Sequence, residues 1–156
     1  MAKIIKAPNT IPYPDMVRYS IFLAGSIDMG NAVDWQKEVE DALSDKNIVI
    51  LNPRRDDWDA TWVQDISNDQ FKQQVQWELD HLEWSDLILV YFDPNGQAPI
   101  TLMELGLHAR SGKMIVCCPE GYWRRGNVQV VCDMYEIPLV NTLEDLIEHA
   151  REWMFD

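Results

Sequence analysis

Two glutamates stand where a carboxylate could do covalent or acid–base chemistry, and Glu104 is the first of them. It comes after an apolar run at 86–92 and a turn at 93–96, so it falls in the first turns of the helix expected next. A carboxylate at that place could attack an electrophilic carbon. The spacing Thr101-x-x-Glu104 also has the form of a capping box, in which the glutamate holds the start of the helix. By spacing alone, the cap is the favoured interpretation.

Glu78 is the second candidate, because it belongs to the inward face of the helix expected over 68–84. It follows Val75 by three residues and precedes Leu82 by four, which is the spacing of a core-facing stripe. A carboxylate on such a face must be paired, hydrogen-bonded or protonated, and burial raises its pKa. The alternative is a glutamate at the edge of the stripe, whose stem reaches solvent.

Gly25 and Ser26 follow the apolar run of the first expected strand, at 19–27. A glycine there lets a ligand approach the backbone, although the dinucleotide fingerprint G-x-G-x-x-G is absent. The alternative is a tight turn between strand and loop, and the sequence leaves both open.

Asn52, Arg54 and Arg55 follow the second expected strand, at 47–53. In a chain this acidic, two arginines at a strand end could hold an anion or stack on a base. They could equally pair with the aspartates that come next. Trp58 could form the wall of a base pocket or cover the core.

The elements that must position these residues alternate between apolar strands and amphipathic helices. Strands are expected at 19–27, 47–53, 86–92, 113–119 and 137–140, and helices at 31–46, 68–84, 100–111, 127–135 and 142–153. Strands that are apolar on both faces predict a parallel sheet covered on both sides. We therefore expect an α/β fold, a flavodoxin-like, doubly wound five-stranded parallel sheet with helices on both faces. Residues 1–156 form one domain in this prediction, with 1–18 as an irregular lead-in, and ligands bind at the carboxyl ends of the strands.

The composition of the chain limits which kinds of molecule it is expected to bind. The 156 residues include 26 Asp and Glu against 13 Lys and Arg, a net charge of −13. Such a surface repels phosphate backbones, which argues against long nucleic acids and leaves a small nucleoside or nucleotide possible. Three cysteines without metal spacing indicate reduced thiols, and no signal peptide or bilayer-spanning run is present, so a cytoplasmic protein without membrane contact is expected. The three histidines (His81, His108 and His149) lie on separate helices and are expected on helix surfaces, so neither a metal nor a cofactor is predicted.

Three segments together resemble the nucleoside 2-deoxyribosyltransferase superfamily, which includes deoxyribosyltransferases and related nucleotide N-glycosidases. They are IFLAGSI at 21–27, Trp77-Glu78-Leu79-x-x-Leu82-x-x-Ser85-Asp86-Leu87-Ile88, and Met103-Glu104-Leu105-Gly106-x-x-x-Ala109. The likeness runs from Tyr19 to Asn141. The NPRR segment at 52–55 is most similar to phage and bacterial branches of the superfamily.

The resemblance implies that Glu104 is a nucleophile that attacks C1′ of the sugar and forms a covalent glycosyl-enzyme, from which a base or water takes the sugar. It places a second acid at Glu78, where the family usually has Asp, for proton transfer at the base or for orienting the sugar. Ala98 stands where the family often has a side chain that hydrogen-bonds to the sugar, with Gln97 beside it. Asn127 matches a segment that family members lend to a neighbouring subunit, which implies a homodimer or larger homo-oligomer.

Three hypotheses follow. The leading one is an enzyme, transferase or hydrolase, that acts on the N-glycosidic bond of a (deoxy)nucleoside or nucleotide; with the resemblance added, a nucleophilic Glu104 explains more of the chain than a cap does. The second is a non-catalytic nucleotide-binding or sensor module with the same fold, which Ala98 favours. The third is an interaction domain, which predicts a solvent-facing, cap-bonded Glu104.

Overall fold

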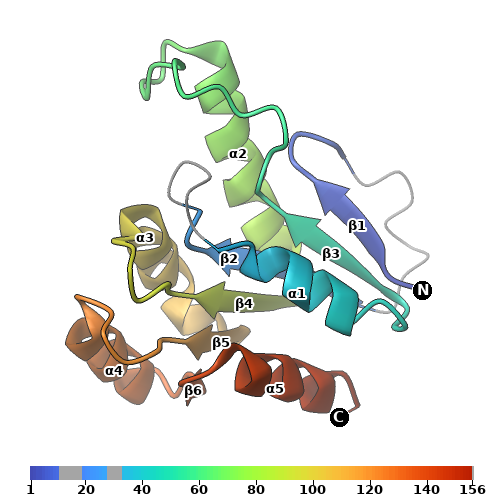
Figure 1. Ribbon diagram of the computed structural model, residues 1–156, viewed down its shortest axis with the longest axis vertical. Coiled ribbons are helices and arrows are strands. Elements are labelled where there is room, and N and C mark those ends of the chain that lie inside the picture. Colours follow the sequence, from blue (N-terminus) through green and yellow to red (C-terminus); the bar gives the residue numbers. More distant parts are fainter. Residues whose placement is uncertain (11–18, 28–32, 156) are drawn as a thin grey trace.

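A parallel sheet of six strands runs through the centre of the computed structural model, which describes residues 1–10, 19–27 and 33–155 (Figure 1). The strands are β1 (Lys3–Lys6), β2 (Tyr19–Gly25), β3 (Ile48–Asn52), β4 (Leu87–Tyr91), β5 (Met114–Cys117) and β6 (Leu139–Val140). Their order across the sheet is β1-β3-β2-β4-β5-β6, and each neighbouring pair is parallel. The predicted α/β class with a parallel sheet is therefore confirmed.

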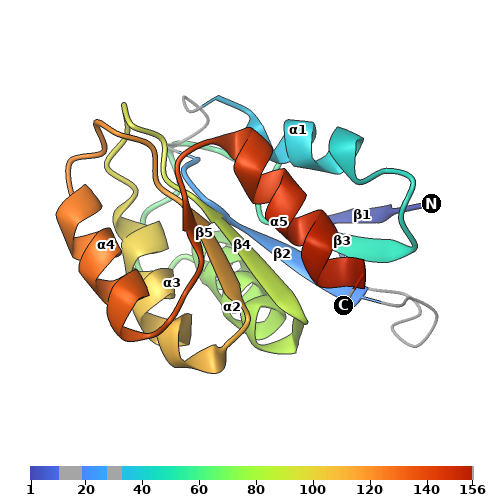
Figure 2. The same ribbon diagram turned by 90° about the horizontal axis from the view of Figure 1, so that it is seen from below.

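Helices cover both faces of this sheet (Figure 2). Two of them, α1 (Trp35–Ala42) and α5 (Leu143–Phe155), share one apolar core with the strands. The other three, α2 (Asp69–Trp84), α3 (Pro99–His108) and α4 (Arg125–Met134), share the core on the opposite face. Because strand residues alternate between faces, the strands β2 to β6 contribute side chains to both cores.

The predicted number of strands is wrong, because the expected lead-in contains β1. This strand pairs with β3 from Lys3 opposite Val49 to Lys6 opposite Asn52. It has only four residues, lies at the edge of the sheet and exposes 42% of Ile4, so it lacks the long apolar run that marks the other strands. The remaining five strands follow the order of a doubly wound sheet. Residues 11–18 of the expected lead-in lie outside the described part of the chain.

The helices α1 and α2 each begin where a side chain accepts a hydrogen bond from one of their first backbone N–H groups. Asp34 Oδ1 accepts from the Lys37 N–H at 3.1 Å before α1, and Asn68 Oδ1 accepts from the Phe71 N–H at 2.9 Å before α2. The sequence predicts a start of the first helix at Asn31, which lies outside the described residues. A short 3-10 turn, Ala109–Ser111, continues α3 and ends at Gly112, whose φ of +73° is open to glycine.

Two smaller expectations can be compared with this fold. The expectation that every histidine lies on a helix surface is wrong for His108, which is 7% exposed and follows Glu104 by one helical turn. Burial lowers the pKa of this imidazole, which favours its neutral form. Among the described helices, none combines the length and the apolar character that crossing a bilayer requires.

Candidate functional site

The carboxyl ends of β2, β3 and β4 meet at one edge of the sheet, where the direction of winding changes. β2 lies between the other two, with Phe22 opposite Leu51 on β3 and Gly25 opposite Tyr91 on β4. In open α/β sheets, ligands bind at this edge and next to this point. The loops that leave these strands, together with the helices α2 and α3, therefore define the candidate site.

Gly25 is explained by packing. A Cβ at this position would lie 2.5 Å from Cζ2 of Trp35 and 2.5 Å from the carbonyl oxygen of Tyr91. Neither distance allows a side chain, so glycine is required for α1 and β4 to approach the end of β2. Of the two interpretations that the sequence leaves open, the structure supports the close internal turn.

Ser26 ties the end of β2 to the end of β4. Its N–H donates to the Tyr91 carbonyl at 3.0 Å, and its Oγ accepts from the Asp93 N–H at 2.9 Å. Its carbonyl accepts from Trp35 Nε1 at 3.2 Å. Ser26 is 1% exposed, so these bonds hold together buried backbone at the ends of β2 and β4 rather than a surface loop.

Glu104 is a buried residue in the second turn of α3. The helix begins at Pro99, after Ala98 at φ +47°, so Thr101 is its third residue and not the residue before it. A capping box is therefore excluded, because its first member must precede the helix. Glu104 itself is 5% exposed, so the interpretation as a solvent-facing cap is wrong.

Glu78 lies in the middle of α2, and its carboxyl influences that of Glu104. Part of the residue meets solvent, but burial of the carboxyl raises the pKa of Glu78 to about 7, against which a hydrogen bond from Gln74 acts. The pKa of Glu104 lies well above its ordinary range, first because of burial and second because of the charge on Glu78. The fold thus brings together the two glutamates that the sequence singled out, from neighbouring helices on one face of the sheet.

Such a pair behaves as one titrating unit. Two carboxyls that repel each other do not both ionise easily near neutral pH, so one proton is retained between them. That leaves one carboxylate able to act as a nucleophile and one carboxylic acid able to donate a proton. Among the described residues no hydrogen bond or ion pair reaches the Glu104 carboxyl, so its environment is set by burial and by Glu78.

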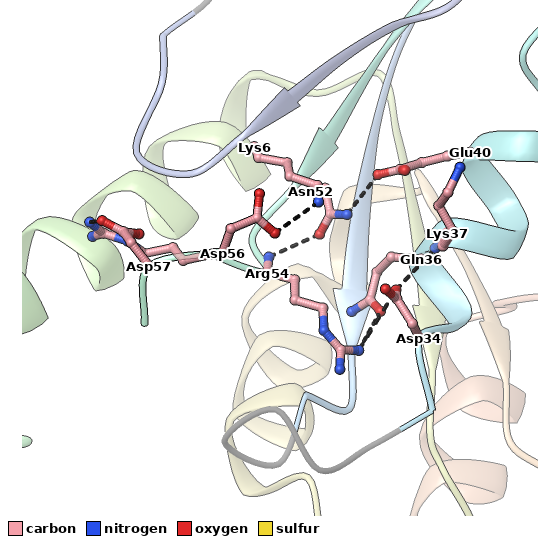
Figure 3. A network of polar contacts seen from close by, with 10 residues as sticks. Lys6, Asp34, Gln36, Lys37, Glu40, Asn52, Arg54, Asp56 and Asp57 are labelled. Atoms are coloured by element: carbon pink, nitrogen blue, oxygen red, sulfur yellow. Dashed lines mark hydrogen bonds and ion pairs between the residues drawn. The ribbon is translucent and has the colours of Figure 1, made fainter. Parts of the chain in front are cut away.

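The segment after β3 is held by a polar network (Figure 3). Asn52 Nδ2 donates to Glu40 Oε1 of α1 at 2.7 Å, and Asn52 Oδ1 accepts from the Arg54 N–H at 2.9 Å. The Arg54 guanidinium reaches back to α1, donating to Gln36 Oε1 at 3.3 Å and lying 3.7 Å from Asp34 Oδ1. Both polar ends of the Asn52 amide are thus engaged inside the protein.

Arg55 pairs with the acidic segment that follows it. Its Nε and Nη2 donate to the two carboxylate oxygens of Asp57 at 2.9 and 3.1 Å. Its guanidinium lies 4.9 Å from the ring centroid of Trp62, against which Trp58 packs edge to face at 5.0 Å. Arg55 thus pairs with one of the aspartates that follow it, the alternative to anion binding that the sequence left open. Arg54 instead lies near Asp34, an aspartate that precedes α1 and that the sequence did not indicate as its partner.

Four buried polar atoms near this edge have no hydrogen-bond partner among the described residues: Gln36 Nε2, Arg55 Nη1, Trp58 Nε1 and Gln74 Oε1. Buried polar groups are normally paired, so each of these needs an explanation. The sequence prediction missed both glutamines, since an uncharged amide gives no strong signal. Gln74 could have been found from its position four residues before Glu78, on the same face of α2.

The segment that contains Glu78 and Glu104 shows the family to which the chain belongs. A family model described as nucleoside 2-deoxyribosyltransferase like matches residues 18–122, which is more than half of the chain and includes both glutamates. The chain belongs to this family. No curated protein matches it. Among solved structures, a conserved protein from Enterococcus faecalis V583 is similar at 15% identity with a TM-score of 0.60, over 86% of this chain and 98% of that chain, and this likeness shows a shared fold.

Three further positions that the resemblance to the deoxyribosyltransferases indicates lie around α3 and α4. Gln97 is exposed, and its carbonyl accepts from the Tyr122 hydroxyl at 2.6 Å and from Trp123 Nε1 at 2.9 Å. Ala98 is 5% exposed and directly precedes α3. Asn127 lies exposed in the first turn of α4, so it is free to meet another molecule, and its role stays a prediction.

The three cysteines are poor candidates for a nucleophile. Burial raises the pKa of Cys117 and Cys132 to about 12 and that of Cys118 to about 11, so these thiols stay protonated at neutral pH. In the part of the chain that the structure describes, no three His, Cys, Asp or Glu side chains gather as a metal ion would need.

Proposed function

We propose that this member of the family cleaves or transfers the N-glycosidic bond of a (deoxy)nucleoside or nucleotide, with Glu104 as the nucleophile. The observation that carries the proposal is the pair of carboxyls on α2 and α3, both with raised pKa values and one of them raised by the other. Carboxyl pairs with perturbed pKa values concentrate at catalytic sites. The pair also lies inside the segment that matches the family.

In the first step, the Glu104 carboxylate forms a bond to C1′ of the sugar while the bond from C1′ to the base breaks. The electron pair of that bond goes to the base, which takes a proton from Glu78. In the second step, the oxygen of water or the nitrogen of another base attacks C1′ and releases the Glu104 carboxylate, and Glu78 takes up the proton of the attacking group. This is the double displacement of retaining glycosidases.

The proton shared by the pair must be on Glu78 when attack occurs. Glu104 is the more buried of the two, so in the empty site burial favours the proton on Glu104. The positive charge that develops at C1′ favours an ionised Glu104 and so shifts the proton to Glu78. Activity then requires one proton in the pair, and it falls both when the pair holds two protons and when it holds none.

Incubation with a panel of deoxynucleosides and their 5′-monophosphates, with and without a second free base, tests this proposal. Chromatography should detect released base or a new nucleoside, and Glu104→Gln should abolish either product. Glu120→Gln is the matched control, since Glu120 is exposed in the loop before α4. If wild type and Glu104→Gln are equally inert across the panel, catalysis is abandoned.

Ala98 favours a second candidate function, a nucleotide-binding or sensor module without turnover. An alanine cannot form the hydrogen bond to the sugar that the family resemblance leads one to expect at this position. In this case a nucleoside or nucleotide should raise the melting temperature and be recovered unchanged, because ligand binding to the native state stabilises it by mass action.

We also propose that the chain assembles as a homodimer or larger homo-oligomer. α3 exposes a stripe of Ile100, Met103 and Leu107, with exposed fractions of 55%, 48% and 57%, and contiguous exposed apolar surface is typical of interfaces. Light scattering after size exclusion measures the mass directly. A monomer at micromolar concentration would contradict this proposal.

A further inference from the structure

Gln74 lies one helical turn before Glu78 on the inward face of α2. It is 6% exposed and donates from Nε2 to the Pro53 carbonyl at 2.8 Å, which joins α2 to the segment after β3. Its amide also acts as a donor toward Glu78, since it lowers the pKa of that carboxyl against the larger effect of burial. Residues four apart on a helix are neighbours, so the amide of Gln74 stands beside the carboxyl that the proposed function makes the proton donor.

The orientation of this amide is fixed by its partners. The Pro53 carbonyl can only accept a hydrogen bond, so the nitrogen of the amide must face it. A donor to Glu78 must also be the nitrogen, which has two hydrogens and can serve both. The oxygen Oε1 therefore points away from both partners, and it is the buried atom that has none among the described residues.

Oε1 differs in chemistry from the other unpartnered atoms of this edge. Gln36 Nε2, Arg55 Nη1 and Trp58 Nε1 are donors, whereas Oε1 is an acceptor. A bound molecule that donates a hydrogen bond would satisfy it. Beside it, Glu78 presents a proton once the reacting sugar favours an ionised Glu104, so the two side chains then offer one acceptor and one donor.

An exocyclic amine next to a ring nitrogen matches that pattern. Adenine has an amino donor beside the acceptor N7, and cytosine has an amino donor at N4, whereas guanine and thymine present an oxygen acceptor at the corresponding place. A carbonyl oxygen opposite Oε1 would set two acceptors against each other. Leaving a buried acceptor unpaired in this way costs about 1–3 kcal/mol, and about 1.4 kcal/mol corresponds to tenfold in an equilibrium.

We propose that Gln74 is a specificity-determining residue whose Oε1 accepts a hydrogen bond from the exocyclic amine of the substrate's base, so that the substrates are amino-base nucleosides or nucleotides rather than their oxo counterparts. This inference rests on the proposed function, because it places the base between Gln74 and Glu78. Gln74 holds the amine while the proton from Glu78 goes to the neighbouring ring nitrogen.

Two pairs of substrates that differ only at this group test the inference: 2′-deoxyadenosine against 2′-deoxyinosine and 2′-deoxycytidine against 2′-deoxyuridine, each also as the 5′-monophosphate. We expect kcat/KM for at least one amino substrate to exceed that of its oxo partner by about tenfold or more. Gln74→Met, which keeps the length of the side chain, should reduce this ratio to near one by lowering the rate of the amino substrate. The matched control is Gln73→Met, since Gln73 is the same residue type and exposed on the same helix.

The outcomes separate the two claims. A ratio near one in the wild type overturns the inference and leaves the proposed function standing, and this measurement needs no variant to fold. A loss of equal size on both members of a pair in a Gln74→Met protein that melts like the wild type also overturns it, since a structural role alone gives that result. No turnover of any of these substrates overturns the proposed function and the inference with it.

Discussion

Two buried glutamates lie on opposite faces of the same sheet, near the carboxyl ends of its central strands, and their surroundings differ. Glu40 on α1 is 3% exposed and accepts a hydrogen bond from Asn52 Nδ2 at 2.7 Å. Glu104 on α3 is 5% exposed, and its pKa is raised first by burial and second by the charge on Glu78. One glutamate has a neutral donor for a neighbour, and the other has a competing acid.

The difference separates structure from chemistry. The Glu40 carboxyl has a hydrogen-bond donor as its neighbour, and this bond links α1 to β3. Two buried carboxyls that lie close together destabilise each other when both are charged. Such a pair binds and releases a proton near neutral pH. Burial alone therefore does not single out a candidate catalytic glutamate, whereas burial without a hydrogen-bonding partner does.

The largest effect is expected on catalysis. Glu104→Gln should lower the rate of base release by at least about 10³-fold, because no nucleophile remains to form the covalent intermediate. Glu40→Gln should keep the wild-type rate within about threefold, since its amide oxygen can still accept from Asn52. Equal losses in these two variants, measured by chromatography of released base, would break the comparison.

Replacement of the second acid should have a smaller effect and change the pH profile. Glu78→Gln should lower kcat by about 10²–10⁴-fold, the usual contribution of a general acid. The wild-type profile should show a limb governed by the pair, with Glu78 titrating at about 7, and the variant should lose that limb. A variant profile that keeps the same limb would assign it to another group.

The hydrogen bond between Asn52 and Glu40 should contribute to the stability of the fold. Asn52→Leu leaves the Glu40 carboxyl and the Arg54 N–H without their partner, which should reduce the free energy of unfolding by about 1–3 kcal/mol. Urea denaturation measures this change. An unchanged midpoint, with unchanged slope, would show that the network on α1 contributes nothing.

The smallest effect, a few degrees in melting temperature, should come from the pH dependence of stability. The folded pKa of Glu78 is about 7 against an ordinary 4.5, so the folded state binds more protons than the unfolded state between these values. Stability is therefore complete below about 4.5 and falls as the pH rises through 7. Glu78→Gln should melt at the wild-type temperature at pH 5 and a few degrees above it at pH 8. The opposite order at pH 8 would mean that the Glu78 charge is stabilising.

The sequence predicted much of this arrangement because the relevant signals are periodic. The apolar stripe of α2 placed Glu78 inward, and the alternation of strands and helices placed α2 and α3 on one sheet. The strand β1 was missed because four residues at an exposed edge carry no comparable pattern. The spacing Thr101-x-x-Glu104 favoured a capping box at the start of the helix, but the helix begins at Pro99.

The sequence could not predict which hydrogen-bond or ion-pair partner each polar atom has. It left Arg54 and Arg55 undecided between aspartate and a ligand, and only the geometry of the chain shows their partners. Its helical spacing could place Gln74 beside Glu78, but it could not show which end of the Gln74 amide is engaged.

The most direct test of Glu104 as a nucleophile is the mass of the intact protein after rapid acid quenching of a reaction with a deoxynucleoside that it turns over. We expect an adduct of one deoxyribosyl group in the wild type, located by peptide mapping on the peptide that contains Glu104 and absent from Glu104→Gln. Turnover with no adduct at any quench time, or an adduct on a peptide without Glu104, would contradict the central claim.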